Sequence, residues 1–348
     1  MINEEMMKNE AVVELRNLTT GYTNKHKVRV VAENLNAEIL SGELTCLLGA
    51  NGSGKSTLLK TLSAFLPAIS GDVMIKGRKL EDYSSKRLAR QIGVVLTERC
   101  SIRNISVGEL VGMGRSPYTG FWGRLSKKDM EIVDEALDFV KITALKNRMV
   151  HTLSDGERQK VMIAKALAQQ TPIIFLDEPT AFLDYPSKVE IMQLLYNLSK
   201  ETNRTVFLST HDLELALQIA DKVWLMKKNE GVSIGTPEDL SMNGSLKNFF
   251  PDTGIVFDTR SGLYQIKHNF KSYITLEGDH HSNVYMMVRK ALNRVGFAVV
   301  KSGTLNNTGL PDSGIIVECT SEGLYILKFK SGEKENFRTI GALLERIR

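Results

Sequence analysis

The chain has 348 residues, of which 42% are hydrophobic and 24% are charged, so it can bury one large core and a smaller second one. Its net charge of +5 is small for this length, and the scattered lysines and arginines favour neither nucleic acid nor an anionic membrane as a direct partner. Cys46, Cys100 and Cys319 lack the spacing of a zinc site or a disulfide framework, and no apolar run is long enough to cross a bilayer, so we expect a cytosolic protein that reaches membranes only through a partner.

The first chemical signal in chain order is the segment LTCLLGANGSGKSTLLKTL at residues 44–62. It predicts a buried strand at 44–48, a glycine-rich turn at 49–54 and a helix from Lys55, which is the order of a GxxxxGK[ST] phosphate loop. Backbone N–H groups of the turn would hold phosphate oxygens, Lys55 would reach the β- and γ-phosphates, and Ser56 would coordinate Mg²⁺. The candidate nucleotide-binding residues here are Gly49, Asn51, Gly52, Ser53, Gly54, Lys55, Ser56 and Thr57.

A second polar loop, LSDGERQ at residues 153–159, runs into a segment with helical spacing. Ser154 followed three residues later by Glu157 satisfies a capping box. The same helix N-terminus also favours an anion, and the two interpretations are compatible because they use the same end of the helix.

The next strand, predicted at residues 173–176, is apolar on both faces, as in a parallel sheet covered by helices. It ends in Asp177 and Glu178. Asp177 is predicted to join Ser56 around Mg²⁺, and Glu178 to be the general base that orients the attacking water. A lone Asp-Glu pair at a strand end is usually a solvated turn or a helix cap. This alternative is less favoured when the chain also contains a phosphate loop.

The order of phosphate loop, LSDGERQ, acidic strand and LSTHD (residues 208–212) resembles the ATP-binding cassette (ABC) ATPases over about residues 12–250. The resemblance implies an α/β fold: a P-loop NTPase cassette with a RecA-like core, an antiparallel β subdomain and an α-helical subdomain. A small C-terminal α+β domain would follow. We expect the cassette over residues 1–248 with its helical subdomain at about 98–170, and a linker with an accessory domain over 249–348.

The resemblance also implies roles for individual residues. Ser154 and Gly156 would contact the γ-phosphate of ATP bound to a second copy, so that two chains close head to tail as a homodimer around two nucleotides. Tyr22 would stack on adenine, although packing is the usual role of a single Tyr in a hairpin. His211 would contact the γ-phosphate as a second catalytic residue beside Glu178. The segment Phe182–Asp184 resembles the D-loop, through which Asp184 would make contacts across the dimer. The implied cofactors are ATP and Mg²⁺.

Two positions depart from the family pattern. Counting along the strand before the helical subdomain puts Thr97 where the family has Gln, and Glu98 follows it. Thr is too short to span the distance that Gln covers, and Glu98 would supply a carboxylate if the loop slips by one residue, so both are candidate metal ligands. Asp155 stands where the family usually has Gly, and it would weaken closure of the dimer unless a cation such as Arg158 compensates for its charge.

The stretch NISVGELVGMGRSPYTGFWGRLSKKD at residues 104–129 resembles importer ATPases that serve iron-siderophore, haem and cobalamin permeases. We expect a surface that docks a permease helix, formed by apolar Val107, Leu110 and Val111 and by an aromatic cluster. Core packing is an equal alternative for the apolar residues. The match is carried by Ser106, Val107, Glu109, Leu110, Val111, Gly114, Arg115 and Pro117, and the aromatic cluster is Tyr118, Phe121 and Trp122.

Residues 241–254 are rich in Ser, Asn and Gly and are predicted to be a linker. Two similar segments follow, beginning at Gly254 and Gly314; each predicts a hairpin followed later by a helix, so we expect a small α+β unit of two related halves. An iron sensor is one interpretation of His268, His280 and His281, but a solvated loop is the preferred interpretation of these histidines. The preferred role of the domain is dimerisation or regulation.

These observations predict the ATP-hydrolysing subunit of an ABC importer, bound peripherally at the cytoplasmic face of the membrane. Its partners would be transmembrane permease subunits, a second cassette and, indirectly, an external substrate-binding protein. The alternatives are a cassette for another substrate or an exporter, a non-transport ABC ATPase acting on DNA or ribosomes, and a nucleotide-gated clamp with weak turnover. The sequence does not indicate which chelate is carried.

Overall fold

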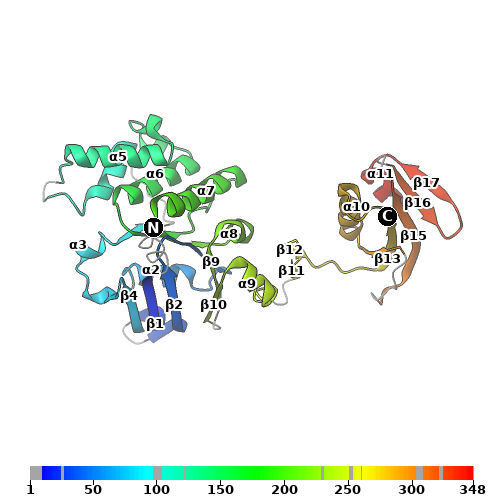
Figure 1. Cartoon of the computed structure of the whole chain (residues 1–348), viewed down its shortest axis with the longest axis horizontal. Helices are drawn as coiled ribbons and strands as arrows, with labels where there is room; N and C mark the ends of the chain where they lie inside the picture. Colours follow the sequence, from blue (N-terminus) through cyan, green and yellow to red (C-terminus); the bar gives the residue numbers. More distant parts are fainter. Residues whose placement is uncertain are drawn as a thin grey trace, which may run out of the picture. The chain divides into compact units, whose positions relative to one another are not determined.

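The computed structural model describes residues 10–24, 27–96, 104–120, 123–228, 231–250, 254–259, 261–302, 309–320 and 324–347. It divides into two compact units (Figure 1). The first comprises residues 1–249 with 259–263, and the second comprises residues 250–258 with 264–348. Among the described residues, no helix has the length and apolar character needed to cross a membrane.

The first unit is built around a six-stranded sheet of order β10-β9-β3-β8-β7-β6, in which only β10 runs antiparallel to its neighbour. Every residue of β3, β7 and β8 is buried, and the apolar runs at residues 44–48 and 173–176 predicted this for β3 and β7. Because these three strands are parallel, the segments that follow them meet at one edge of the sheet. The strands are β3 (Leu44–Gly49), β6 (Ile92–Val95), β7 (Ile173–Asp177), β8 (Thr205–Thr210), β9 (Lys222–Lys227) and β10 (Gly231–Gly235).

A four-stranded antiparallel sheet of order β2-β1-β4-β5 packs against this central sheet. The two share one apolar core, in which Leu18 and Ile39 of the antiparallel sheet lie with Leu47, Phe207 and Trp224 of the central sheet. The strands are β1 (Ala11–Asn24), β2 (Lys27–Leu40), β4 (Ser70–Ile75) and β5 (Arg78–Lys79).

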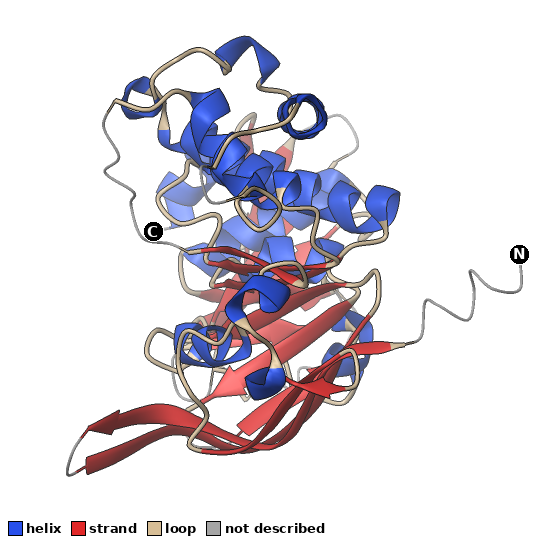
Figure 2. Cartoon of the chain, turned by 90° about the vertical axis from the view of Figure 1, so that its left-hand side faces the viewer, coloured by secondary structure: helices blue, strands red, loops and turns tan. Residues whose placement is uncertain are grey.

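Helices complete the unit. The helix α2 (Lys55–Leu62) contacts β3, β7 and β8, while α7 (Tyr185–Thr202) contacts β3 and β8. Most of the helices lie together above the strands in Figure 2. Among them, α4, α5 and α6 form a layer of their own by packing on one another. The remaining helices are α3 (Ser85–Leu88), α4 (Val107–Gly112), α5 (Lys127–Phe139), α6 (Asp155–Ala168), α8 (Leu213–Ile219) and α9 (Pro237–Met242).

The helical layer corrects one prediction. Val107, Leu110 and Val111 are 0%, 1% and 0% exposed, so they belong to the core and cannot form the expected docking surface. Apolar residues at helical spacing mark a buried face, and here α5 and α6 cover that face. Phe121 and Trp122 lie outside the described residues.

The second unit holds a five-stranded sheet of order β14-β13-β15-β16-β17, with parallel pairs between β13 and both β14 and β15. Its core joins sheet residues such as Leu276 and Val317 to Leu292 and Leu343 of two helices. The first of the two similar segments forms a separate two-stranded sheet, β11-β12, whereas the second forms β15-β16 within the larger sheet. The elements are β11 (Ile255–Asp258), β12 (Leu263–Ile266), β13 (Ser272–Glu277), α10 (Asn283–Arg294), β14 (Phe297–Lys301), β15 (Asp312–Cys319), β16 (Tyr325–Phe329), β17 (Lys334–Phe337) and α11 (Ile340–Ile347).

The predicted fold class is confirmed: an α/β core with an antiparallel sheet and a helical layer, and a small α+β unit. The iron-sensor alternative finds no support in the described residues. There, no three His, Cys, Asp or Glu side chains lie close enough together to hold a metal ion.

Candidate nucleotide-binding site

The glycine-rich loop joins β3 to α2 as the sequence predicts, and its glycines have specific tasks. Gly54 is the N-cap of α2 and has φ of 108°, a backbone conformation that side-chain-bearing residues rarely adopt. A Cβ at Gly54 would collide with Val31 of β2 and would lie 2.9 Å from the terminal carbon of Met226. Gly52 has φ of 78° with open space where a side chain would be. The loop therefore keeps its backbone uncovered at the N-terminus of a helix, where an anion is favoured.

Lys55 and Ser53 supply polar groups that suit a phosphate. Lys55 is 5% exposed, and its Nζ donates hydrogen bonds to the carbonyl oxygens of Gly49 at 2.9 Å and Ala50 at 3.4 Å. The hydroxyl of Ser53 is buried and has no hydrogen-bond partner among the described residues. A buried cation and an unpaired buried hydroxyl in one loop are costly unless a ligand uses them, so these residues fit a bound phosphate.

The carboxylate of Asp177, at the end of β7, lies against the phosphate-loop helix. Its Oδ1 accepts hydrogen bonds from Ser56 at 3.0 Å and from Ser209 at 2.6 Å, and Asp177 is 6% exposed. Ser56 and Asp177 are therefore neighbours, as the sequence predicted. One hydroxyl and one carboxylate fit Mg²⁺, which usually takes one or two protein oxygens and completes its shell with water and phosphate.

Glu178 lies between the phosphate loop and the end of β8. Its Oε1 is 3.6 Å from Lys55 Nζ, and its Oε2 is 3.5 Å from His211 Nδ1. Glu178 has φ of 45°, and its backbone N–H donates to Ser209. A left-handed conformation costs a residue other than Gly about 1–2 kcal/mol, so the surrounding contacts must hold this carboxylate in place. Three segments far apart in the sequence thus converge on one point.

Ser209 and the acidic residue after His211 were missed from the sequence. Ser209 pairs with Asp177 across the parallel β7-β8 ladder and hydrogen-bonds both Asp177 and the backbone of Glu178. Asp212 accepts hydrogen bonds from Thr180 at 2.6 Å and from Lys188 at 2.9 Å. Burial opposes ionisation of Asp212, but these two donors outweigh it and lower its pKa. A signal for Ser209 existed in its place within the LSTHD motif, two residues before His211.

Tyr22 lies on β1, beside the start of α2. Its hydroxyl is 3.2 Å from Thr57 Oγ1, and 46% of the residue is exposed. The ring is thus held near the phosphate loop with a surface free for stacking.

The LSDGERQ loop caps α6. The backbone N–H of Glu157 donates to Ser154 Oγ at 3.2 Å, and that of Ser154 donates to Glu157 Oε2 at 2.9 Å, which confirms the capping box. The hydrogen bond from the Ser154 backbone N–H is the largest cause of the lowered pKa of Glu157. Arg158 lies 3.3 Å from Asp155, so the expected compensating cation is in place. A Cβ at Gly156 would lie 3.3 Å from Ser187 Oγ.

Asp184 caps the neighbouring helix α7. Its Oδ1 accepts from the backbone N–H of Ser187 at 3.1 Å, and hydrogen bonds from Ser187 lower its pKa. Phe182, two residues earlier, has φ of 66° and is 72% exposed. The LSDGERQ loop and the Phe182–Asp184 segment therefore lie side by side through the contact of Gly156 with Ser187. Thr97 and Glu98 lie outside the described residues.

Arg115, in the stretch expected to dock a permease, proves to be a buried structural residue. It is 5% exposed and donates to Asp129 at 2.9 Å, the carbonyl oxygen of Ala168 at 2.7 Å and Gln170 at 3.0 Å. Hydrogen bonds from Ser126 and then from Arg115 lower the pKa of Asp129 to about 2.

A groove of about 650 Å³ lies beside this cluster, lined by residues of α4, α6 and the segment between α4 and α5. Met113, on its rim, is 50% exposed, and Pro117, Lys165 and Gln169 also line it. It is a hollow on the helical layer.

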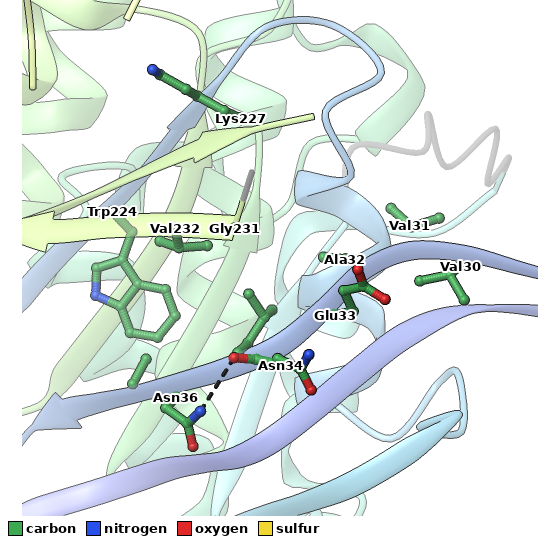
Figure 3. Close-up of a pocket in the computed structure, with 12 residues that line it drawn as sticks. Val30, Val31, Ala32, Glu33, Asn34, Asn36, Trp224, Lys227, Gly231 and Val232 are labelled. Atoms are coloured by element: carbon green, nitrogen blue, oxygen red, sulfur yellow. Dashed lines mark hydrogen bonds between the residues drawn. The ribbon is translucent and has the colours of Figure 1, made fainter. Parts of the chain in front are cut away.

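A second hollow, of about 610 Å³, lies between β2 and the β9-β10 pair (Figure 3). Trp224 lines it with Asn34 and Asn36, and Asn36 Nδ2 donates to the carbonyl oxygen of Asn34 at 3.2 Å. Of the predicted nucleotide-site residues none lines this hollow, so it is separate from the candidate site.

A glycine-rich loop after a buried parallel strand, a lysine at the helix start and a strand-end carboxylate hydrogen-bonded to the adjacent serine define a P-loop nucleotide-binding protein. Two family models match the chain: one described as ABC transporter over residues 32–181, and one described as iron ABC transporter C-terminal domain over residues 271–348.

Known relatives agree with the first of these models. An uncharacterized ABC transporter ATP-binding protein of Methanocaldococcus jannaschii is 40% identical over 258 residues, which cover 74% of this chain and 88% of that protein. The ferric enterobactin transport ATP-binding protein FepC of Escherichia coli is 39% identical over 66% of this chain and 84% of its own length. A solved dimeric ATP-binding cassette in a post-hydrolysis state with ADP and Pi is 30% identical, with a TM-score of 0.57 over 64% of this chain and 98% of that one.

The chain therefore belongs to the ATP-binding cassette family of transporter ATPases. It is an ATP-hydrolysing subunit of an ABC importer, as the sequence predicted, and ATP binding is the common property of its relatives and structural neighbours.

Proposed function

We propose that this ATPase subunit drives the import of an iron-siderophore chelate or a related haem or cobalamin cargo. The observation that carries the mechanism is the convergence on Glu178, whose two oxygens lie 3.6 Å from Lys55 Nζ and 3.5 Å from His211 Nδ1. The cargo class is supported by the match to an iron ABC transporter C-terminal domain and by the ferric enterobactin relative.

In this mechanism the phosphate loop and Lys55 bind the triphosphate of ATP, and Tyr22 stacks on the base. Lys55 now donates to the carbonyl oxygens of Gly49 and Ala50, which the phosphates would replace as acceptors. Asn51, Gly52, Gly54 and Thr57 complete the cradle through the backbone of the loop and the first turn of α2.

Ser56 and Asp177 would hold Mg²⁺, which when bound neutralises charge on the β- and γ-phosphates. Thr97 and Glu98 stay candidate ligands. Glu178 would orient and deprotonate the attacking water, and His211 would contact the γ-phosphate.

Two copies would close head to tail, so that Ser154 and Gly156 of each cover the nucleotide of the other. The capping box supports this because it holds the N-terminus of α6 in shape. The exposed Phe182 and the cap Asp184 would make contacts across the dimer. Hydrolysis would reopen the pair and cycle a permease at the cytoplasmic face of the membrane.

The groove of about 650 Å³ on the helical layer is our proposed seat for the permease helix, in place of the buried Val107, Leu110 and Val111. We assign the cassette to residues 1–248 and the linker with the accessory domain to 249–348. The division of the chain into compact units near residue 250 supports this assignment.

The test compares steady-state ATP hydrolysis by wild type, Glu178→Gln and the matched control Glu201→Gln, an exposed glutamate of α7. We expect Glu178→Gln to lose at least about 100-fold in kcat, as removal of a general base does, and to accumulate an ATP-bound dimer in light scattering. Equal turnover by the two variants would remove Glu178 from the mechanism.

The cargo is tested separately by ATP-dependent uptake into vesicles that carry the subunit with its permease. Ferric siderophore, haem and cobalamin are supplied one at a time. Accumulation of none of them, with ATP hydrolysis intact, would overturn the cargo class and leave the ATPase mechanism standing.

A further inference from the structure

Arg29 is an exposed cation on β2 that the nucleotide site described above does not use. It lies directly opposite Tyr22 in the β1-β2 ladder. It has no hydrogen-bond, ion-pair or ring partner among the described residues, so its guanidinium is available to a ligand.

The side of the hairpin that carries Arg29 can be worked out from the ladder. Directly opposed residues of an antiparallel pair project to the same face, so Arg29 shares a face with Tyr22. That face looks toward α2, because the Tyr22 hydroxyl reaches Thr57, and because Thr20, two residues earlier on β1, shares a hydrogen bond with Thr61. Arg29 therefore projects toward the side of the hairpin on which the nucleotide would lie.

A bulge ties this part of β2 to the phosphate loop. Thr20 pairs with Ala32, and the next residue of β1, Gly21, pairs with Val30. The register therefore shifts by one residue here, and Val31 is the extra residue of the bulge. Val31 packs against Gly54, because a Cβ at Gly54 would collide with the Val31 side chain. Bulges re-aim the side chains near them, and this one anchors β2 two residues from Arg29. In Figure 3, Val30 and Val31 lie next to each other on this strand.

We propose that Arg29 donates hydrogen bonds to the edge of the nucleoside whose base lies on the Tyr22 ring. The inference rests on the proposed role of Tyr22. The Cα atoms of opposed residues are about 4.5–5.5 Å apart, so a base stacked on Tyr22 places an edge, not a face, next to Arg29. A guanidinium has donors only, so it recognises ring nitrogens, ribose oxygens or a 6-carbonyl, and it makes no bond with a 6-amino group. Arg29 is thus a specificity-determining residue that favours a nucleoside over bare polyphosphate and accepts a 6-oxopurine at least as well as a 6-aminopurine.

The experiment measures binding of ATP, ITP and inorganic tripolyphosphate by calorimetry, in the full chain carrying Glu178→Gln so that nucleotide is not consumed. Arg29→Ala is compared with Arg29→Lys and with Lys27→Ala, which removes the same charge two rungs nearer the hairpin tip, opposite Asn24. Tyr22→Ala serves as the check on the base site.

We expect Arg29→Ala to weaken ATP binding about 3- to 10-fold, the range of a net hydrogen bond, and ITP binding by at least as much. In Arg29→Ala, tripolyphosphate binding stays within about twofold of the parent chain. Lys27→Ala changes ATP binding by less than about twofold. Arg29→Lys recovers only part of the lost ATP affinity, because an ammonium lacks the planar fork of a guanidinium.

Two results overturn the proposal while sparing the nucleotide site. If tripolyphosphate affinity falls by the same factor as ATP affinity, Arg29 acts only as a general positive charge; if ATP and ITP affinities are unchanged, Arg29 makes no contact. By contrast, an unchanged ATP affinity in Tyr22→Ala, or no ATP binding by the parent chain, would show that the base site itself is wrong. Circular dichroism of each variant checks that a lost affinity is not lost folding.

Discussion

Arg115→Met tests how the helical layer is held together. The Arg115 side chain is 6% exposed, its Asp129 partner is 14% exposed, and their nitrogen and oxygen lie 2.9 Å apart. The substitution keeps an apolar stem but removes the donor to Asp129 Oδ1 and to the Ala168 carbonyl oxygen, while Ser126 still donates to Asp129 Oδ2. Removing one partner of a buried ion pair costs about 3–5 kcal/mol, and the partly exposed carboxylate places the expected loss near the lower end of that range.

Thermal unfolding followed by circular dichroism measures this loss. At about 2–4 °C per kcal/mol for a unit of this size, the transition of the first unit should fall by roughly 6–12 °C. The control is Arg148→Met, because Arg148 is exposed and its guanidinium donates to the carbonyl oxygen of Thr152 at 3.2 Å. We expect that control to shift the transition by less than about 3 °C. Equal shifts in the two variants would refute the view that Arg115 is a structural residue.

Four further outcomes are expected. Gly54→Ala should abolish ATP binding in calorimetry, because the new Cβ would collide with Val31. Gly52→Ala places its Cβ in open space, so it should lower the free energy of unfolding by only about 1–2 kcal/mol through backbone strain, as measured by thermal unfolding. Asp155→Gly should strengthen ATP-dependent dimerisation about two- to fivefold in light scattering, because it releases Arg158 from its ion pair beside the proposed phosphate site. The pKa of Asp129 is lowered from 3.8 to about 2. The ionised carboxylate therefore stabilises the fold fully above pH 3.8, and this stabilisation is lost as the pH falls through about 2. Acid unfolding of an Asp129→Asn variant should lack this loss of stability. Removing Mg²⁺ with EDTA should stop hydrolysis in wild type, and Ser56→Ala should raise the Mg²⁺ concentration needed for half-maximal activity.

Local patterns predicted the parts of the site that local chemistry determines. The strand expected at residues 44–48 is β3 (Leu44–Gly49), and the helix expected from Lys55 begins there. The strand expected at 173–176 is β7 (Ile173–Asp177). An apolar run bounded by glycines or carboxylates leaves a chain few other conformations, so these elements follow from sequence alone.

Features that depend on a distant segment could not be predicted. Ser209 acts through Asp177, which is 32 positions away and becomes a neighbour only when β7 and β8 pair. Arg115 is buried because Asp129 and the C-terminal end of α6 surround it. The apolar residues of α4 illustrate the same limit, because helical spacing marks a covered face without indicating whether the cover is the same chain or a partner.

The contacts of Glu178 connect nucleotide binding to catalysis. Glu178 lies between Lys55 and His211, two groups that the proposed mechanism assigns to the γ-phosphate. In that mechanism ATP would take Lys55 and His211 away from Glu178, and the carboxylate would become free to orient water only once the phosphate is in place. Because the left-handed backbone of Glu178 is held by Ser209, the carboxylate stays where it is while its partners change.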